Sequence, residues 1–255
     1  MAGHLDINDL HVRFGKATIL QGVSLSVRDK PLSVVGRNGM GKTTMCAAVM
    51  GMVPASGSIT LDERDILGLN TGRIARQGIA LVPQGRRMFP SLTVHEHLLL
   101  VAQRGTPPWT IDRIYETFPR LAERRKNGGN QLSGGEQQML AISRALLMNP
   151  QLVIMDEPSE GLAPVIVDHL IEVLRTIAAE GMGLLLIEQN LRVATSVADE
   201  VSIMVTGRIA ATVDAAELAR DREMQNRYLG VSHGHLTRIR HWNLRHESGR
   251  TGLCL

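Results

Sequence analysis

Aromatic residues are scarce in this chain of 255 residues, where Phe, Trp and Tyr together make up 3% of the total. Because 44% of the residues are hydrophobic, the chain still has enough aliphatic side chains to fill a globular core, in one large domain or two small ones. Cysteine is rarer still, and Cys46 and Cys254 lie too far apart in sequence to suggest a disulfide framework. The composition therefore favours an aliphatic globular protein of a reducing compartment.

Long hydrophobic runs are missing as well. No apolar stretch approaches the ~18–20 residues that a membrane-spanning helix requires. The opening sequence, MAGHLDINDL, lacks the basic region and the apolar core of a signal peptide. We therefore expect an intracellular protein that does not itself cross a membrane.

The chain has little net charge, and its excess of +3 is confined to one end. The segment 231–255 holds four arginines and one glutamate of the 28 basic and 25 acidic side chains, which leaves 24 of each sign in residues 1–230. A balanced body argues against a large nucleic-acid-binding face. Because the segment 231–255 is rich in His, Arg and Gly and has no apolar periodicity, we expect it to be disordered.

Buried strands alternate with helices along much of the chain. Apolar runs typical of buried strands occupy residues 32–36, 78–84, 152–158 and 183–189. Helical patterns follow three of these runs, over residues 43–53, 164–181 and 191–200. This alternation predicts an α/β fold with a mostly parallel sheet. Short strands are expected before it, within residues 5–35, and a hairpin is expected after it, around Gly207.

A helical block, about residues 86–150, interrupts this alternation. The segments 91–103 and 111–125 both show the helical spacing of apolar residues. In the first segment we expect His95 and His97 to be exposed, and the core stripe to comprise Leu98, Leu99, Val101 and Ala102. The block is predicted to be a helical subdomain inserted into a domain that spans residues 1–230.

One glycine-rich segment, the phosphate loop, matches the pattern G-x-x-x-x-G-K-[ST] between a buried strand and a helix. Glycines let the backbone approach an anion closely, and the free N–H groups at the helix start then face the phosphates. Lys42 supplies a positive charge for the β- and γ-phosphates, and the Thr43 hydroxyl is a ligand for Mg²⁺. The candidate nucleotide-binding residues are Gly36, Arg37, Asn38, Gly39, Met40, Gly41, Lys42, Thr43 and Thr44. The alternative is a glycine-rich turn that merely opens a helix.

An acidic pair, Asp156 and Glu157, ends the apolar run LVIMDEP. The carboxyl ends of parallel strands face the ligand crevice of such a sheet. There Asp156 would hold Mg²⁺ and Glu157 would polarise the attacking water, because phosphoryl transfer depends mainly on a well-placed nucleophile. The alternative is an acidic flank of the following helix.

The segment LSGGEQQ, residues 132–138, contains the S-x-x-E spacing of a capping box between Ser133 and Glu136. Two glycines leave the start of the predicted helix bare, which makes it a second anion site. Since one nucleotide has a single γ-phosphate, a second site makes sense if it closes on the nucleotide of another subunit. The candidate contacts are Ser133, Gly134, Gly135 and Gln137, and the alternative is an ordinary capped helix.

With these motifs, residues 5–230 resemble the ATP-binding subunits of ABC transporters. The resemblance implies a P-loop NTPase core of mostly parallel sheet, an N-terminal antiparallel β subdomain and an inserted helical subdomain. It also implies that Phe14 stacks on adenine, and that Gln84 links Mg²⁺ and the catalytic water to the helical subdomain. A core Phe and a solvated turn are the respective alternatives. The loop from Ser159 to Ala163 is implied to cross a dimer interface.

Two departures from the wider family are informative. The switch position, usually His, is Gln189, and the usual Asp of the loop after the acidic pair is Ala163. Both resemble the second ATP-binding subunit of branched-chain amino-acid uptake systems and the related urea subunits. A neutral Gln can donate a hydrogen bond to a γ-phosphate but exchanges no proton, so Gln189 is assigned hydrogen bonding, with an inactive switch as the alternative. A third departure is Pro31, which could alter the strand before the phosphate loop.

The resemblance implies an ATP- and Mg²⁺-dependent hydrolase that powers an importer of branched-chain or other amino acids. Its partners would be a second ATP-binding subunit, in a hetero- or homodimer, transmembrane permease subunits and, indirectly, a solute-binding protein, with no nucleic acid. It would lie peripherally on the cytoplasmic face of the inner membrane. The alternatives are a urea or amide importer, a non-transport ABC ATPase acting on DNA or ribosomes, and a module that holds ATP without hydrolysing it.

Overall fold

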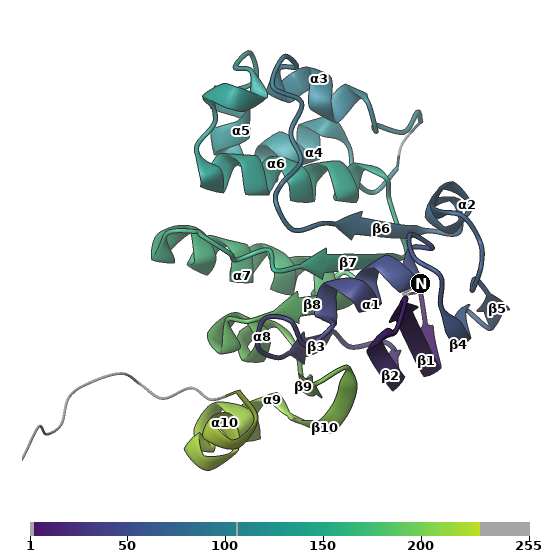
Figure 1. Ribbon diagram of the computed structural model, residues 1–255. Coiled ribbons are helices and arrows are strands. Elements are labelled where there is room, and N and C mark those ends of the chain that lie inside the picture. The colour runs from purple at the N-terminus through teal and green to yellow at the C-terminus, as the bar shows by residue number, and fades with distance from the viewer. Residues whose placement is uncertain (1–2, 106, 230–255) are drawn as a thin grey trace, which may run out of the picture.

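The computed structural model describes residues 3–105 and 107–229 (Figure 1). The segment 231–255, for which disorder is predicted, lies outside the described residues. At the centre is a six-stranded sheet in the order β10-β9-β3-β8-β7-β6. Its strands are β3 (Leu32–Val35), β6 (Ile79–Val82), β7 (Leu152–Asp156), β8 (Gly183–Glu188), β9 (Glu200–Val205) and β10 (Arg208–Asp214). From β9 to β6 the neighbours pair parallel, and β10 returns antiparallel to β9 in the hairpin predicted around Gly207.

A second, antiparallel sheet has the order β2-β1-β4-β5. Its strands are β1 (Leu5–Phe14), β2 (Ala17–Val27), β4 (Ser56–Leu61) and β5 (Arg64–Asp65). The first two are longer than the short strands expected from the sequence. The apolar alternation breaks at Asp9, which has a φ of 50° where the β1–β2 register is irregular, so a single bulged strand has the pattern of two short ones.

Helices lie on both sides of the six-stranded sheet. The segments predicted as helical after the strands form α1 (Lys42–Val49), α7 (Pro164–Ala179) and α8 (Leu191–Val197). Three short helices, which the sequence analysis did not predict, are α2 (Thr71–Arg76), α9 (Ala215–Arg220) and α10 (Arg222–Leu229). Within the part of the chain that the structure describes, no helix is both long and apolar enough to span a bilayer.

The block at about residues 86–150 forms a group of helices on the β6 side of the molecule, drawn in teal in Figure 1. Its elements are α3 (Val94–Leu99), α4 (Ile111–Thr117), α5 (Pro119–Glu123), a 3-10 turn (Gly129–Gln131) and α6 (Gly134–Leu147). The segment 111–125 is divided into two helices because Pro119 lacks an N–H and disfavours helical geometry at Phe118, whose φ and ψ are −125° and 74°.

Two predictions for α3 are wrong. His97 is fully buried (0% exposed), whereas Leu99, expected in the core, is 55% exposed. The buried face of α3 consists of Val94, His97 and Leu98, which recur at helical spacing. Because one of them is polar, a prediction based on apolar residues alone placed this face wrongly. Burial of His97 is offset by two hydrogen bonds, since Nδ1 donates to the Thr93 carbonyl at 2.8 Å and Nε2 accepts from the Phe89 N–H at 3.0 Å.

The sheet separates two large cores, because alternate side chains of a strand point to opposite faces. On β7, Val153 and Met155 join a cluster with the helical block, α7 and α8, whereas Leu152 and Ile154 join a cluster with α1 and the antiparallel sheet. The helical block therefore shares one continuous core with the sheet. Pro31 lies just before β3, outside the residues that pair with β8 and β9, so its missing N–H removes no bond from the ladder.

Candidate active site

The phosphate loop connects the end of β3 to the start of α1. Gly39 and Gly41 have φ values of 80° and 101°, a region that residues with a Cβ rarely adopt, and Gly41 is the N-cap of α1 without a side-chain cap. The first N–H groups of α1 are therefore free to bind an anion. A Cβ at Gly36 would come within 2.6 Å of the Met204 carbonyl oxygen, so the first glycine is required for close packing against β9.

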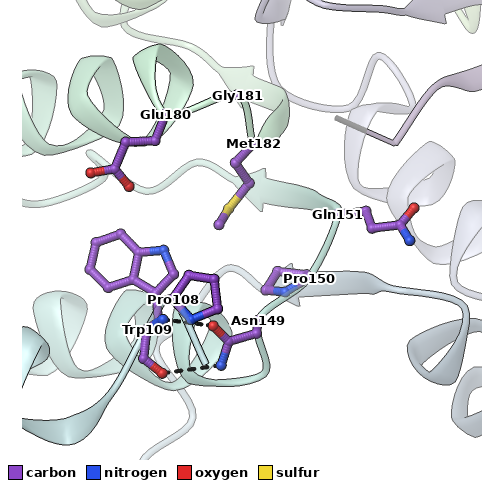
Figure 2. A pocket seen from close by; sticks show the side chains of 8 residues that line it. All are labelled: Pro108, Trp109, Asn149, Pro150, Gln151, Glu180, Gly181 and Met182. Carbon is purple, nitrogen blue, oxygen red and sulfur yellow. Dashed lines mark hydrogen bonds between the residues drawn. The ribbon is translucent and has the colours of Figure 1, made fainter. Parts of the chain in front are cut away.

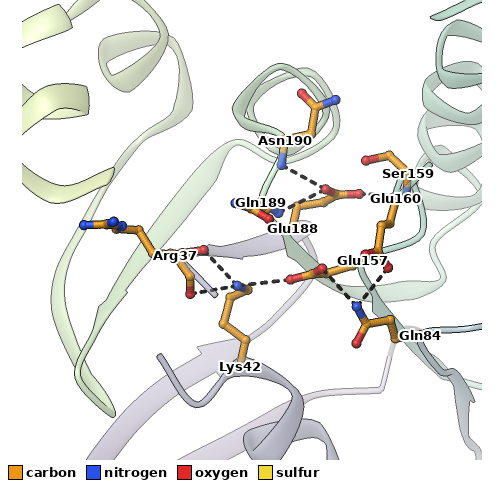
Figure 3. A network of polar contacts seen from close by, with 10 residues as sticks. Arg37, Lys42, Gln84, Glu157, Ser159, Glu160, Glu188, Gln189 and Asn190 are labelled. Carbon is orange, nitrogen blue, oxygen red and sulfur yellow. Dashed lines mark hydrogen bonds and ion pairs between the residues drawn. The ribbon is translucent and has the colours of Figure 1, made fainter. Parts of the chain in front are cut away.

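Lys42, the first residue of α1, is buried where the loop meets this helix, with 4% of its surface exposed. Its Nζ donates to the carbonyl oxygens of Gly36 at 2.8 Å and Arg37 at 3.2 Å. The same atom forms an ion pair with Glu157 Oε1 at 3.1 Å (Figure 3). The ammonium that is predicted to bind phosphate is thus held beside the predicted catalytic carboxylate.

A pocket of about 350 Å³ opens over the loop. It is lined by Ile19, Asn38, Gly39, Gly41, Lys42, Thr43, Thr44, Gln84 and Glu157. Three residues of the predicted phosphate loop, Gly36, Arg37 and Met40, do not line it. Their carbonyl oxygens instead hold the loop in shape. The Gly36 and Arg37 oxygens accept from Lys42, and the Met40 oxygen accepts from the Gly207 N–H at 3.0 Å.

Asp156, the last residue of β7, is 3% exposed, and its Oδ1 is buried without a hydrogen-bond partner among the described residues. Burial raises the pKa of Asp156; a hydrogen bond from Thr43 opposes this shift, and the charge of Glu157 adds to it. An unpartnered carboxylate oxygen beside a hydroxyl is the hard oxygen chemistry that suits Mg²⁺. The residues present therefore fit the cation that the sequence predicts here.

Glu157 and Gln84 meet beside this carboxylate. Glu157 has a φ of 50°, and its N–H donates to the Ile187 carbonyl at 2.9 Å, so the backbone leaves β7 in a sharp turn. Gln84 Nε2 donates to Glu160 Oε2 at 2.8 Å and lies 3.4 Å from Glu157 Oε2. Sequence reasoning missed Glu160, because it considered the segment SEGLAP only as part of an interface.

Gln189 lies in an adjoining hollow of about 290 Å³, which it shares with Glu157, Ser159, Glu160, Glu188 and Asn190. The predicted switch residue is therefore close to Glu157 but outside the lining of the pocket over the phosphate loop. Sequence reasoning also missed Glu188, whose signal was a charged residue at the end of the apolar run GLLLIE. Such a residue is almost never fully buried without partners.

The segment around Ser133 stands apart from both hollows. Ser133 and Glu136 form the predicted capping box at the start of α6, with each side chain accepting from the other's backbone N–H. The Arg86 guanidinium lies against Gly134, and Gly135 lies against Ile166 of α7. Gln137 Nε2 donates to the Gly129 carbonyl at 3.0 Å. None of the four predicted contacts lines the pocket over the phosphate loop.

The remaining predicted contact, Phe14, is at the end of β1 and is 49% exposed. It does not line the pocket over the phosphate loop, although Ile19 of the next strand does. An exposed ring is available for stacking on a base, whereas the alternative of a core Phe does not agree with this exposure.

A separate pocket of about 250 Å³ lies near the other ends of β7 and β8 (Figure 2). It is lined by Pro108, Trp109, Asn149, Pro150, Gln151, Glu180, Gly181 and Met182. Asn149 exchanges hydrogen bonds with the backbone of Trp109, at 2.7 and 3.1 Å. Because α/β sheets bind ligands at the carboxyl ends of their strands, the pocket over the phosphate loop agrees better with the nucleotide site that the sequence predicts.

A phosphate loop, a buried acidic pair and a second capped helix start, on a parallel sheet, define a P-loop ATPase of the ABC type. The chain belongs to the ABC transporter family, whose model matches residues 20–160. It is an ATP-binding, ATP-hydrolysing member of that family.

Several characterised relatives cover most of the chain. It is 37% identical over 231 residues to the high-affinity branched-chain amino acid transport ATP-binding protein BraG of Pseudomonas aeruginosa. This alignment covers 89% of this chain and 99% of BraG. It is 32% identical over 219 residues to the lipopolysaccharide export system ATP-binding protein LptB of Escherichia coli, spanning 83% and 91%. A nucleotide-free ATP-binding cassette from an ABC transporter matches the fold with a TM-score of 0.76 and 25% identity, over 89% and 99% of the two chains.

Proposed function

We propose that this chain is the ATP-hydrolysing subunit of an ABC importer for branched-chain or other amino acids. The observation that carries the proposal is the 37% identity to BraG over 99% of that protein's length. Gln189 and Ala163, which depart from the wider family, support the same assignment.

In the proposed reaction, Phe14 stacks on adenine and the phosphate loop binds the phosphates through its backbone and Lys42. Mg²⁺, which neutralises charge on the phosphates when bound, would be held by Thr43, Asp156 and Gln84. Binding of ATP offers Lys42 new anionic partners, so its ion pair with Glu157 opens. The freed Glu157 carboxylate then polarises the attacking water, and Gln189 donates to a γ-phosphate oxygen.

A second ATP-binding subunit completes the proposed site. Ser133, Gly134, Gly135 and Gln137 lie at a capped helix start that is suited to an anion but does not line the phosphate pocket of its own chain. Two chains, alike or different, would therefore bind two ATP molecules, each between one phosphate loop and the partner's capped helix. Closure of this dimer would act on transmembrane permease subunits through the helical block near Gln84.

The proposed setting is the cytoplasmic face of the inner membrane, where the chain is bound peripherally to its permease. A solute-binding protein acts indirectly by delivering cargo, and no nucleic acid is involved. A urea or amide importer is the second candidate, because the same two departures occur in the related urea subunits. An export role, as in the name of LptB, and a non-transport ATPase are outcomes that the tests below distinguish.

The catalytic part is tested by Glu157→Gln in the complex with its permease. The variant should bind ATP but turn over slowly, because the amide cannot act as a base. Turnover as fast as that of the wild type would refute the assignment. Glu160→Gln is the matched control, since Glu160 also accepts from Gln84 but is not assigned as the base.

The cargo is tested in proteoliposomes that hold the chain with its transmembrane permease subunits. Solute-binding protein loaded with leucine should accelerate ATP hydrolysis, and the permease should transport leucine to the side where this chain is bound. Acceleration by urea or a short amide alone would favour the second candidate. Transport away from the ATPase side would contradict import.

A further inference from the structure

Glu188, the last residue of β8, is a buried acid with no role in the proposed reaction. It is 1% exposed and forms no ion pair with a basic side chain of the described residues. The alternation along β8 places it on the same face as Leu184 and Leu186, which pack in the core shared with α7 and α8. A carboxylate in this position needs other partners to offset the loss of water.

Those partners are three backbone N–H groups from two different loops, together with the Ser159 side chain. Glu188 Oε1 accepts from Ser159 at 3.0 Å, in the loop that follows Glu157. Its Oε2 accepts from Gln189 and from Asn190, both at 3.1 Å. Figure 3 shows the carboxylate between these two loops, with one oxygen directed to each.

The switch residue is the only one between the end of β8 and the N-cap of α8. On its far side, Asn190 caps α8 by accepting from the N–H groups of Arg192 and Val193. On its near side, Glu188 holds both the Gln189 and the Asn190 N–H groups. The direction in which the Gln189 side chain leaves the backbone is therefore fixed by the Glu188 carboxylate together with the cap.

The loop after the acidic pair is bound to β8 at two points. The Glu157 N–H donates to the Ile187 carbonyl at 2.9 Å, and two residues later the Ser159 N–H donates to Glu188. One carboxylate thus fixes the start of the loop from Ser159 to Ala163 and the switch residue in a single arrangement.

We propose that Glu188 is a positioning residue, which couples the switch residue Gln189 to the loop after Glu157 by accepting N–H groups from both. The inference rests on the roles proposed above for Glu157 and Gln189. Hydrolysis requires the base and the γ-phosphate donor to be placed together, whereas ATP binding depends on the phosphate loop. The Glu188 side chain forms its hydrogen bonds with the other two loops, and only its backbone pairs with Val35, just before the phosphate loop, so a side-chain substitution keeps that pairing. Its loss should therefore lower kcat and leave ATP affinity unchanged.

The test compares Glu188→Gln with Leu186→Val in the full chain, assembled with its second ATP-binding subunit and its permease. The Gln side chain has the same shape but a single acceptor oxygen, so it satisfies one loop and turns an N–H toward the other. We expect kcat to fall about 10–100-fold, the loss that is typical when a residue that orients a metal ligand is replaced. The dissociation constant of a fluorescent ATP analogue should stay the same. Leu186→Val lies two residues away on the same buried face and should retain kcat despite a loss of stability.

Two further variants separate the possible outcomes. Glu188→Asp keeps both acceptor oxygens and should recover part of the lost kcat, which a general packing defect would not do. The losses of kcat from Glu188→Gln and Gln189→Ala should be less than additive in the double variant, because both substitutions take the Gln189 amide donor away from the γ-phosphate. Equal kcat values for Glu188→Gln and Leu186→Val, or full additivity with Gln189→Ala, would overturn the inference. If Glu157→Gln is also fully active, the proposed function itself fails; if Glu157→Gln is inactive, only the role of Glu188 is refuted.

Discussion

Replacing Asp156 with Asn should stabilise the protein in the absence of divalent cations. The carboxylate is buried, its Oδ1 lacks a hydrogen-bond partner among the described residues, and the charge of Glu157 lies beside it. A buried polar group left unsatisfied costs about 1–3 kcal/mol, and Asn removes the charge while it keeps an acceptor for Thr43. We expect a gain near the lower end, about 1 kcal/mol, because the new amide N–H groups lack an acceptor in turn. In a domain of this size, that raises Tm by about 2–4 °C.

Thermal unfolding in EDTA at neutral pH measures this gain, with Glu116→Gln as a control for the loss of an exposed carboxylate. The pKa of Asp156 is raised above its ordinary value of 3.8 in the folded protein. The charged carboxylate therefore lowers the free energy of unfolding of the wild type in full at any pH above the folded-state pKa. This loss of stability disappears as the pH falls from the folded-state pKa to 3.8. The difference between the two proteins should therefore shrink on acidification. Mg²⁺ with ATP should stabilise the wild type more than the variant, by mass action. A variant less stable than the wild type in EDTA would refute the reasoning.

Three further substitutions test two residues of the site, Lys42 and Phe14, and one buried residue of the helical block, His97. Lys42→Met leaves the buried Glu157 carboxylate without its cation and should cost about 3 kcal/mol, part of which Glu157→Gln recovers in the double variant. Urea unfolding measures both, and additive effects would contradict the pairing. His97→Ala removes the acceptor for the Phe89 N–H and opens a cavity, at a cost of about 2–4 kcal/mol; unchanged stability in the same assay would show that these contacts contribute nothing. Phe14→Ala should weaken ATP binding about 10-fold and Phe14→Tyr should not, since aromatic stacking on a base contributes about 1–3 kcal/mol. Equal affinities in a nucleotide titration would exclude Phe14 from the adenine site.

The phosphate loop and the capping box could be predicted because their geometry is local. Positive φ angles at Gly39 and Gly41 demand glycine, and the bonds between Ser133 and Glu136 join residues three apart. The parallel sheet was likewise predictable, because strands buried on both faces have continuous apolar runs.

Contacts between distant segments could not be predicted in the same way. Glu188 and Ser159 are 29 positions apart, and their contact depends on how two loops leave neighbouring strands. Glu160 binds Gln84 across 76 positions. His97 was misplaced because its burial depends on a backbone N–H of Phe89, in a loop that has no periodic pattern. Residue types predict local chemistry, whereas the partners of a buried polar side chain follow from tertiary structure.

The core shared by the helical block and β7 has a mechanical consequence. Leu140 and Leu146 of α6 pack in the same cluster as Val153 and Met155 of β7, the strand that ends at Asp156. A close-packed interior resists compression and transmits strain instead of absorbing it. A force on α6 would therefore displace the strand that precedes Asp156 and Glu157. The helical block would move together with these two carboxylates and would not rotate independently of them.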